Sequence, residues 1–186
     1  MSKKILLHAC CAPCLLFPFR SLVESGYEPV VYFYNPNIMP YREFRKRLSS
    51  VKEYCGSHVI PMILDEQYSL ERMLRLYLDR GNSPRCLVCY KERLHKTAAL
   101  AVEKGFDAFT TTLSVSPYQN HNLIREAGEN ASRAFNVPFL YQDWTSGFKI
   151  AHEEAKRENL YLQSYCGCIF SEEERYRPSV RKRMNK

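Results

Sequence analysis

The chain has 186 residues, of which 45% are hydrophobic, and this is enough for one domain with a buried core. No stretch approaches the roughly 18 consecutive apolar residues of a transmembrane helix, and the short apolar run after Lys3 and Lys4 predicts a first strand rather than a signal peptide. We therefore expect a cytoplasmic protein with no membrane partner. In that compartment its eight cysteines stay reduced, which favours metal or redox chemistry over disulfides.

The net charge of +7 is unevenly distributed along the chain. Residues 175–186 contain six basic side chains, Arg181 among them, and no acidic one. A second basic cluster includes Arg42 and Arg45 and lies beside two aromatic residues. Such patches fit a polyanion, for which nucleic acid is the usual cytosolic candidate, although a solvated helix face and a frayed tail would have the same composition.

Strands and helices are predicted to alternate along the chain. The expected strands are Ile5–His8, Pro29–Tyr34, Val59–Leu64, Asp107–Leu113 and Pro138–Tyr141. Helices are expected before Gly26 and over 41–54, 68–78, 90–104, 122–135 and 149–158. This order predicts a doubly wound, mostly parallel α/β sheet of about five strands in a single domain. We expect residues 1–174 to form the metal-binding catalytic domain and residues 175–186 a basic tail.

Three cysteines follow the first strand. Cys10, Cys11 and Cys14 lie at the predicted strand-to-helix turn, with Pro13 in the first turn of the helix. In parallel α/β sheets, ligands bind beyond the carboxyl ends of the strands. Consecutive side chains leaving a strand point to opposite faces, so Cys10 and Cys11 either serve two centres or are brought together by the turn.

Four further cysteines lie in two later segments. Cys86 and Cys89 begin a predicted helix, so their sulfurs share one face, and the helix N-terminus is expected to lower their pKa. Cys166 and Cys168 flank a glycine in a loop, whereas Cys55 is expected to be an ordinary buried residue. Seven thiols exceed the four ligands of one iron–sulfur or zinc site. This excess indicates an iron–sulfur cluster with a second metal or an open redox thiol.

Four linked motifs extend over nearly the whole chain. They are His8-x-Cys10-Cys11-Ala-Pro-Cys14, Arg85-Cys86-x-x-Cys89 with Arg93-Leu94, Phe109-Thr-Thr-Thr-Leu113-x-x-Ser116-Pro-Tyr-Gln-Asn120, and Leu160-Tyr161-x-Gln163-x-Tyr165-Cys166-Gly-Cys168-x-Phe-Ser171. In this order they resemble the QueH family of epoxyqueuosine reductases. The resemblance implies a fold of the adenine-nucleotide α-hydrolase (HUP) type and removal of the epoxide oxygen of epoxyqueuosine at the tRNA wobble position, without cobalamin. It also implies a 4Fe–4S cluster, a neighbouring mononuclear iron and an electron donor that the sequence does not identify.

Our hypothesis for the metal ligands divides the thiols between two centres. The cluster is assigned to Cys10, Cys11, Cys86 and Cys89, and the second metal to Cys14, Cys166 and Cys168 with Asp107 as a carboxylate ligand. Spacing alone does not decide which thiol holds which iron.

The proton that releases the oxygen as water needs a donor, for which Tyr118, Asp143 and Tyr165 are the candidates. Gln119 and Asn120 are expected either to recognise a base edge or to cap the next helix. The contacts to the anticodon loop are expected from Arg42, Arg45 and the tail with Arg181, because wobble-base chemistry requires the base to leave the stack.

Three other functions fit parts of the pattern. An ATP-dependent tRNA-thiolating enzyme of the PP-loop class needs a glycine-rich loop after the first strand, and Ala9–Pro13 contains no glycine. A zinc-stabilised RNA-binding module without catalysis would be colourless, whereas an iron–sulfur protein is brown. A thiol–disulfide oxidoreductase would remain active without metal.

Overall fold

The computed structural model describes residues 2–184, and the side chains of residues 2–177. Within these residues, four strands form one parallel sheet in the order β3-β2-β1-β4. The strands are β1 (Lys3–His8), β2 (Tyr27–Phe33), β3 (Met62–Leu64) and β4 (Ala108–Thr111). The last four residues of β1 and all of β4 are buried, as expected for parallel strands that are covered on both faces.

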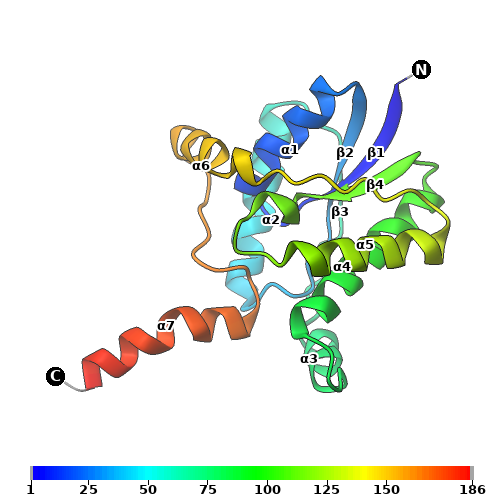
Figure 1. Ribbon diagram of the computed structural model, residues 1–186. Coiled ribbons are helices and arrows are strands. Elements are labelled where there is room, and N and C mark those ends of the chain that lie inside the picture. The colour runs from blue at the N-terminus through cyan, green and yellow to red at the C-terminus, as the bar shows by residue number, and fades with distance from the viewer. Residues whose placement is uncertain (1, 185–186) are drawn as a thin grey trace.

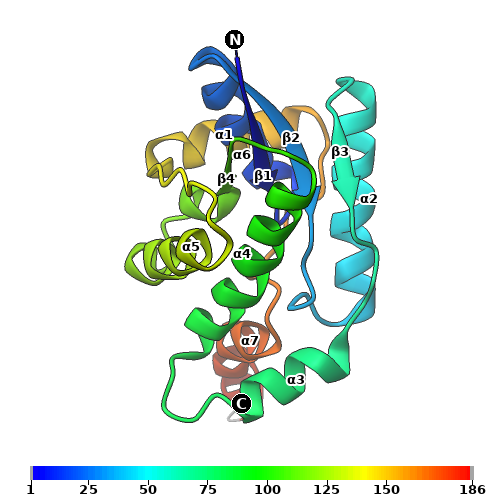
Figure 2. The same ribbon diagram turned by 90° about the vertical axis from the view of Figure 1, so that its right-hand side faces the viewer.

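Helices cover both faces of the sheet (Figures 1 and 2). They are α1 (Ala12–Glu24), α2 (Tyr41–Ser57), α3 (Leu70–Leu78), α4 (Arg85–Glu103), α5 (His121–Phe135), α6 (Phe148–Arg157) and α7 (Ile169–Met184), with the short 3₁₀ helices η1 (Thr112–Val115) and η2 (Thr145–Gly147). On one face α1 packs against α2 and α6, and on the other α4 packs against α5. This division follows from right-handed crossovers, because the chain winds from β1 to β3 in one direction and returns to β4 in the other.

The strand order reverses between β1 and β4, so the switch point of the sheet lies at the carboxyl ends of these two strands. His8, the last residue of β1, pairs with Tyr32 of β2 and Thr111 of β4. The loop after β1 therefore lies beside η1, which follows β4 directly. Ligands of doubly wound sheets bind at this switch point.

The predicted fold class is confirmed, with one difference in the sheet. The segment expected as a fifth strand, Pro138–Tyr141, forms only an isolated parallel bridge between Phe109 and Phe139. Two backbone hydrogen bonds hold this bridge, from Phe109 N to the Pro138 carbonyl and from Leu140 N to the Phe109 carbonyl. The Thr110 hydroxyl then donates to the Leu140 carbonyl at 2.7 Å, so a side chain takes the place of the next backbone pair.

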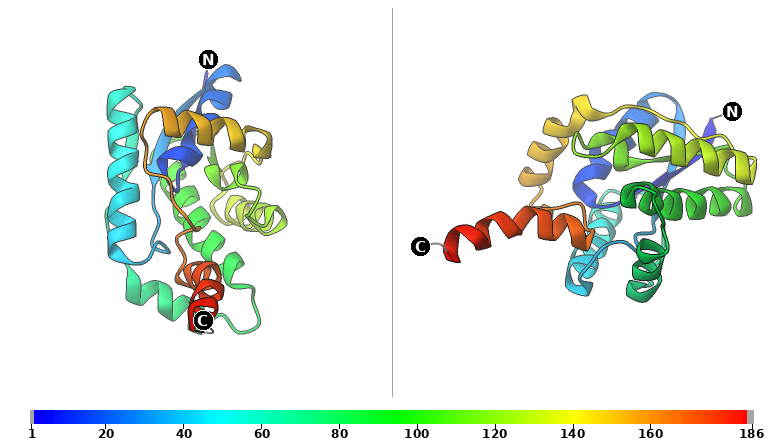
Figure 3. Two further views of the ribbon diagram at one scale, coloured as in Figure 1. Left: turned by 90° about the vertical axis from the view of Figure 1, so that its left-hand side faces the viewer. Right: turned by 60° about the horizontal axis from the view of Figure 1, so that its bottom comes forward.

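The predicted boundary after residue 174 lies inside α7, which is one continuous helix and points away from the sheet (Figure 3). The division into a catalytic domain and a tail therefore stays a prediction. In the described part of the chain, no helix combines the length and the apolar character that crossing a membrane requires.

Candidate metal centre

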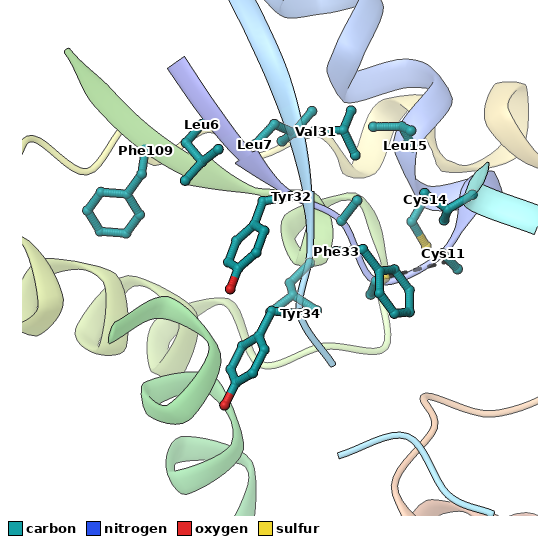
Figure 4. Packing of buried hydrophobic residues seen from close by; sticks show 14 of the residues in the cluster. Leu6, Leu7, Cys11, Cys14, Leu15, Val31, Tyr32, Phe33, Tyr34 and Phe109 are labelled. Atoms are coloured by element: carbon teal, nitrogen blue, oxygen red, sulfur yellow. Dashed lines mark hydrogen bonds between the residues drawn. The ribbon is translucent and has the colours of Figure 1, made fainter. Parts of the chain in front are cut away.

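The thiols of Cys10, Cys11 and Cys14 form one compact, buried group. Their sulfur atoms all lie within 4.8 Å of one another, and those of Cys10 and Cys11 are 3.6 Å apart. Cys11 is the extended N-cap residue of α1, and the first turn of this helix brings Cys14 back towards it. The turn thus brings the sulfur atoms of Cys10 and Cys11 together. Of the two alternatives that the sequence left open, this is the one in which the turn joins the consecutive cysteines. Cys11 and Cys14 also belong to the apolar cluster between the sheet and α1 (Figure 4).

Hydrogen bonds around this group stabilise one negative charge on it. Cys10 accepts from the thiols of Cys11 and Cys14, and these bonds hold its pKa well below the usual range. Burial raises the pKa of Cys11, and the bond to Cys10 raises that of Cys14. The Thr112 hydroxyl lies 3.7 Å from Cys10 Sγ, and Gln163 Nε2 donates to Cys11 Sγ at 2.9 Å. Three close thiols, one of which has a lowered pKa, form a donor set suited to a soft metal ion.

A second group of thiols forms where the first turn of α4 meets the loop before α7. Cys86 and Cys89 interact electrostatically with both Cys166 and Cys168. The buried Tyr77 hydroxyl has no hydrogen-bond partner of its own among nitrogen and oxygen atoms of the described residues, and its pKa is raised by burial and then by the neighbouring Cys89 and Cys168. Four thiols from two segments match the ligand number of a 4Fe–4S cluster, which holds its thiolates farther apart than a single ion does.

The expectation that the helix N-terminus lowers the thiol pKa values of α4 was wrong. Burial raises the pKa of Cys89 to about 11 and also raises the pKa of Cys86. Loss of hydration therefore outweighs the helix dipole at these two thiols.

Two buried arginines adjoin the thiols, and the sequence reasoning did not identify either as a site residue. Arg47 donates to the carbonyls of Tyr165 at 2.9 Å and Cys166 at 3.1 Å, and it pairs with Glu43 at 2.7 Å. Arg93 donates from Nη2 to Cys89 Sγ at 3.1 Å. Arg47 belongs to a basic cluster whose composition is typical of an exposed helix face, so its burial could not be predicted. For Arg93, the only signal in the sequence is its spacing, because it follows Cys89 by one helical turn.

His8 lies at the end of β1 as a neutral, fully hydrogen-bonded residue. Its Nε2 donates to the Tyr34 carbonyl at 3.1 Å, so Nδ1 is the atom that accepts from the Thr111 hydroxyl at 2.9 Å. Burial, followed by the charge of Arg93, lowers the pKa of His8 to about 4. The structure thus shows His8 as a buried core residue whose two ring nitrogens are both satisfied.

Comparison with known proteins places the chain in a family. The family model described as "Epoxyqueuosine reductase QueH" matches residues 5–174. This chain belongs to the QueH family. Among curated relatives named Epoxyqueuosine reductase QueH, the protein of Dehalococcoides mccartyi is 33% identical over 95% of this chain and 96% of its own length. That of Thermotoga maritima is 33% identical over 90% of this chain and 89% of its own.

Solved structures resemble this QueH-family chain in fold alone. The U34-tRNA thiolase NcsA from Methanococcus maripaludis, solved with its 4Fe–4S cluster, matches with a TM-score of 0.54 at 12% identity, over 91% of this chain and 61% of that one. A predicted subunit of tRNA methyltransferase from Methanocaldococcus jannaschii matches with a TM-score of 0.53 at 12% identity, over 83% of this chain and 74% of that one. These likenesses support the HUP-type fold that the motifs implied.

The grouping of thiols in this QueH-family chain differs from the predicted partition. Cys10 and Cys11 lie with Cys14, whereas Cys86 and Cys89 lie with the pair from the last loop. Spacing shows which thiols share a segment, but not which segments meet, so the division of these thiols between two metals stays a prediction.

Asp107 does not reach the thiols. It precedes β4, and its carboxylate accepts from the backbone N–H of Lys4 at 2.8 Å, near the start of β1. The cysteines follow the other end of β1, and at about 3.3 Å per residue the length of the strand separates them from Asp107. Its assignment as a metal ligand is therefore wrong.

The three predicted proton donors lie in different environments. Asp143 accepts from the N–H and hydroxyl of Thr145, which holds the pKa of this carboxyl below its usual range and makes it a poor acid at neutral pH. The Tyr165 hydroxyl donates to the Met39 carbonyl, and burial raises its pKa. Tyr118 is 84% exposed, and its ring meets the ring of Phe148 edge-on.

The residues predicted to contact nucleic acid also lie in different environments. Asn120 caps α5 by accepting from Leu123 N at 3.1 Å, so the structure shows the capping alternative, and Gln119 accepts from the Tyr90 hydroxyl at 2.6 Å. Arg42 and Arg45 are exposed on α2. The side chain of Arg181 lies outside the described residues.

Proposed function

We propose that this protein is an epoxyqueuosine reductase, which removes the epoxide oxygen of epoxyqueuosine at the wobble position of tRNA. The observation that carries the proposal is the gathering of seven thiols into two groups beside the switch point of the sheet, in a chain whose residues 5–174 match the family. The reaction consumes two electrons and two protons and yields an alkene and one molecule of water.

The donor chemistry of the two groups fits the two metals that the family resemblance implies. We assign a 4Fe–4S cluster to Cys86, Cys89, Cys166 and Cys168, and a mononuclear iron to Cys10, Cys11 and Cys14. When bound, a cluster supplies electrons one at a time, and a neighbouring iron supplies a Lewis acid for an oxygen atom. The electrons come from an external donor of the cell.

The protein's own groups would hold these ligands in place. Arg47 ties the loop carrying Cys166 to α2 through two carbonyls, and a Cβ at Gly167 would lie 3.2 Å from Arg47 Nη1. Gln163 orients the thiols of Cys11 and Cys14 from the other side, with its Nε2 at 2.9 and 3.6 Å from the two sulfurs. Such outer contacts fix metal ligands and tune their basicity.

For the proton, we propose Tyr118 as the donor. Asp143 is held as a carboxylate, and the Tyr165 hydroxyl is engaged with a backbone carbonyl. Tyr118 is exposed next to Gln119, which contacts Tyr90 on α4 beside the cysteines. An exposed phenol at this place is available to a substrate that approaches from solvent.

For the substrate, we propose that the exposed arginines of α2 bind tRNA phosphates. Arg42 lies one turn before Lys46, and Arg45 directly precedes it; the ammonium group of Lys46 is over the Tyr161 ring at 5.4 Å. Basic groups interleaved with aromatic rings suit an anticodon loop whose wobble base is splayed out. None of the eight cysteines, which all lie within the described residues, forms a disulfide, in keeping with the reducing, cytoplasmic location that we propose.

The test is turnover of the modified tRNA. Anaerobically reconstituted protein, a chemical reductant and tRNA carrying epoxyqueuosine should give queuosine with loss of one oxygen atom, measured by mass spectrometry of the digested nucleosides. Protein that contains full iron and sulfide but leaves the epoxide intact would contradict the proposal. ATP consumption with sulfur incorporation into tRNA would instead support the thiolase alternative.

A further inference from the structure

Arg93 contacts the metal-binding thiols directly. Its side chain is 3% exposed and turns back along α4 towards the preceding turn. There Nη2 donates to Cys89 Sγ at 3.1 Å and Nε donates to the Cys89 carbonyl at 3.2 Å. The guanidinium also lies over the Tyr90 ring, at 5.6 Å from its centroid. Within the described residues, both hydrogen bonds of this buried cation therefore end on one cysteine.

No carboxylate neutralises Arg93 among the residues that the structure describes, whereas the other buried arginine, Arg47, pairs with Glu43 at 2.7 Å. A buried charge without a counterion is strongly unfavourable. Of the acidic groups around Arg93, the thiols of Cys89 and Cys10 act most strongly on it. Once these thiols bind metal as thiolates, the counterion of Arg93 is sulfur, one from each of the two groups.

We infer that Arg93 is the counter-cation of the metal centre at Cys89 and makes that centre easier to reduce. This inference rests on the proposed cluster at Cys86, Cys89, Cys166 and Cys168. Adding an electron to a thiolate-bound centre increases its negative charge, and a buried cation stabilises the reduced state more than the oxidised one. The N–H···S bond acts in the same direction, because it withdraws charge from the ligand.

The chain offers a matched control for this role. Arg85 precedes the same cysteine pair, and its charge also acts on Cys86 and Cys168. Its side chain is 35% exposed and pairs with Glu174, so solvent and a carboxylate already screen it. Loss of Arg85 removes an equal formal charge without removing a bond to sulfur.

The test is a redox titration of reconstituted wild type, Arg93→Met, Arg93→Lys and Arg85→Met, each followed by electron paramagnetic resonance. Arg93→Met should shift the midpoint potential to more negative values, Arg93→Lys should lie between it and wild type, and Arg85→Met should stay near wild type. Iron and sulfide are measured in every sample. Equal potentials for Arg93→Met and wild type at equal loading would overturn the inference, whereas wild type that forms no cluster would overturn the proposed function instead.

A second measurement covers the case in which Arg93→Met does not fold or load. Wild type labelled with ¹⁵N-arginine should show a ¹⁵N hyperfine coupling to the reduced centre in pulsed paramagnetic resonance, and Arg93→Lys should lose it. Absence of this coupling in loaded wild type would overturn the inference without any variant.

Discussion

At the scale of single residues, Gln163 contacts the thiols that we propose as iron ligands. Its Nε2 donates to Cys11 Sγ at 2.9 Å, and its buried Oε1 has no partner among the described residues. A buried acceptor without a donor is unfavourable unless a bound group satisfies it. This unpartnered oxygen supports a bound group at the proposed iron site.

Gln163→Leu should weaken iron binding at Cys10, Cys11 and Cys14 by about 10- to 100-fold, the usual effect of removing such an outer contact. The measurement is competition for iron with a chelator, and exposed Gln67→Leu serves as the control. Equal iron retention in the two variants would show that Gln163 does not support this site.

Tyr118→Phe should slow epoxide removal by at least about 100-fold, because it removes the proposed proton donor. Stability and metal content should not change, since the side chain is 84% exposed. Single-turnover rates measure the effect, with Tyr27→Phe at the opposite end of the sheet as the control. A rate equal to that of wild type would mean that a group other than Tyr118 donates the proton.

At the scale of elements, the packing of α5 on the isolated bridge has a sharp steric requirement. A Cβ at Gly128 of α5 would lie 2.0 Å from the ring of Phe139, which packs in turn on Phe109. By contrast, a Cβ at Gly56, near the end of α2, would meet no atom within 4 Å. The two helical glycines therefore differ in their surroundings and not in their backbone preference.

Gly128→Ala should lower the free energy of unfolding by about 1–3 kcal/mol through overpacking. Gly56→Ala should raise it by up to about 1 kcal/mol, because alanine favours the helix. Urea unfolding of both variants at equal metal content measures the difference. Stabilisation by both substitutions would mean that Phe139 moves aside without cost.

Sequence patterns predicted most of these elements because apolar runs and end signals are local. Gly26 and Gly105 ended helices as expected, and both have positive φ angles. The prediction of a fifth strand was wrong because a pattern of apolar residues does not show how many backbone hydrogen bonds a short edge segment makes with the sheet. The site depended on contacts between distant segments, so the seven thiols were predictable but their grouping and the buried arginines were not.

At the scale of the whole molecule, the proposed binding of tRNA depends on exposed basic groups. Arg42 is exposed on α2, and Arg45 pairs only weakly with Glu66, at 3.9 Å and in solvent. Binding to phosphates releases counterions, so affinity falls steeply with salt. Exposed pairs of this kind contribute little to stability and leave the arginines available for a polyanion.

The variant with Arg42→Ala and Arg45→Ala should bind tRNA more weakly at low salt, and the slope of log K against log salt should become shallower by roughly 1 to 2 units. Filter binding over a salt series measures this slope, and the variant with Lys104→Ala and Lys149→Ala controls for net charge. An unchanged slope would place the phosphate contacts elsewhere.

The central claim is that the molecule holds two separate metal centres, one on each group of thiols. The most direct measurement is iron and sulfide analysis with Mössbauer spectra of two reconstituted variants, Cys86→Ser with Cys89→Ser and Cys10→Ser with Cys11→Ser. The first pair should abolish sulfide and the cluster spectrum. The second should keep four sulfides per chain, as a 4Fe–4S cluster requires, and lose only the additional iron. Loss of the cluster in the second variant would contradict the account and restore the partition in which Cys10 and Cys11 are cluster ligands.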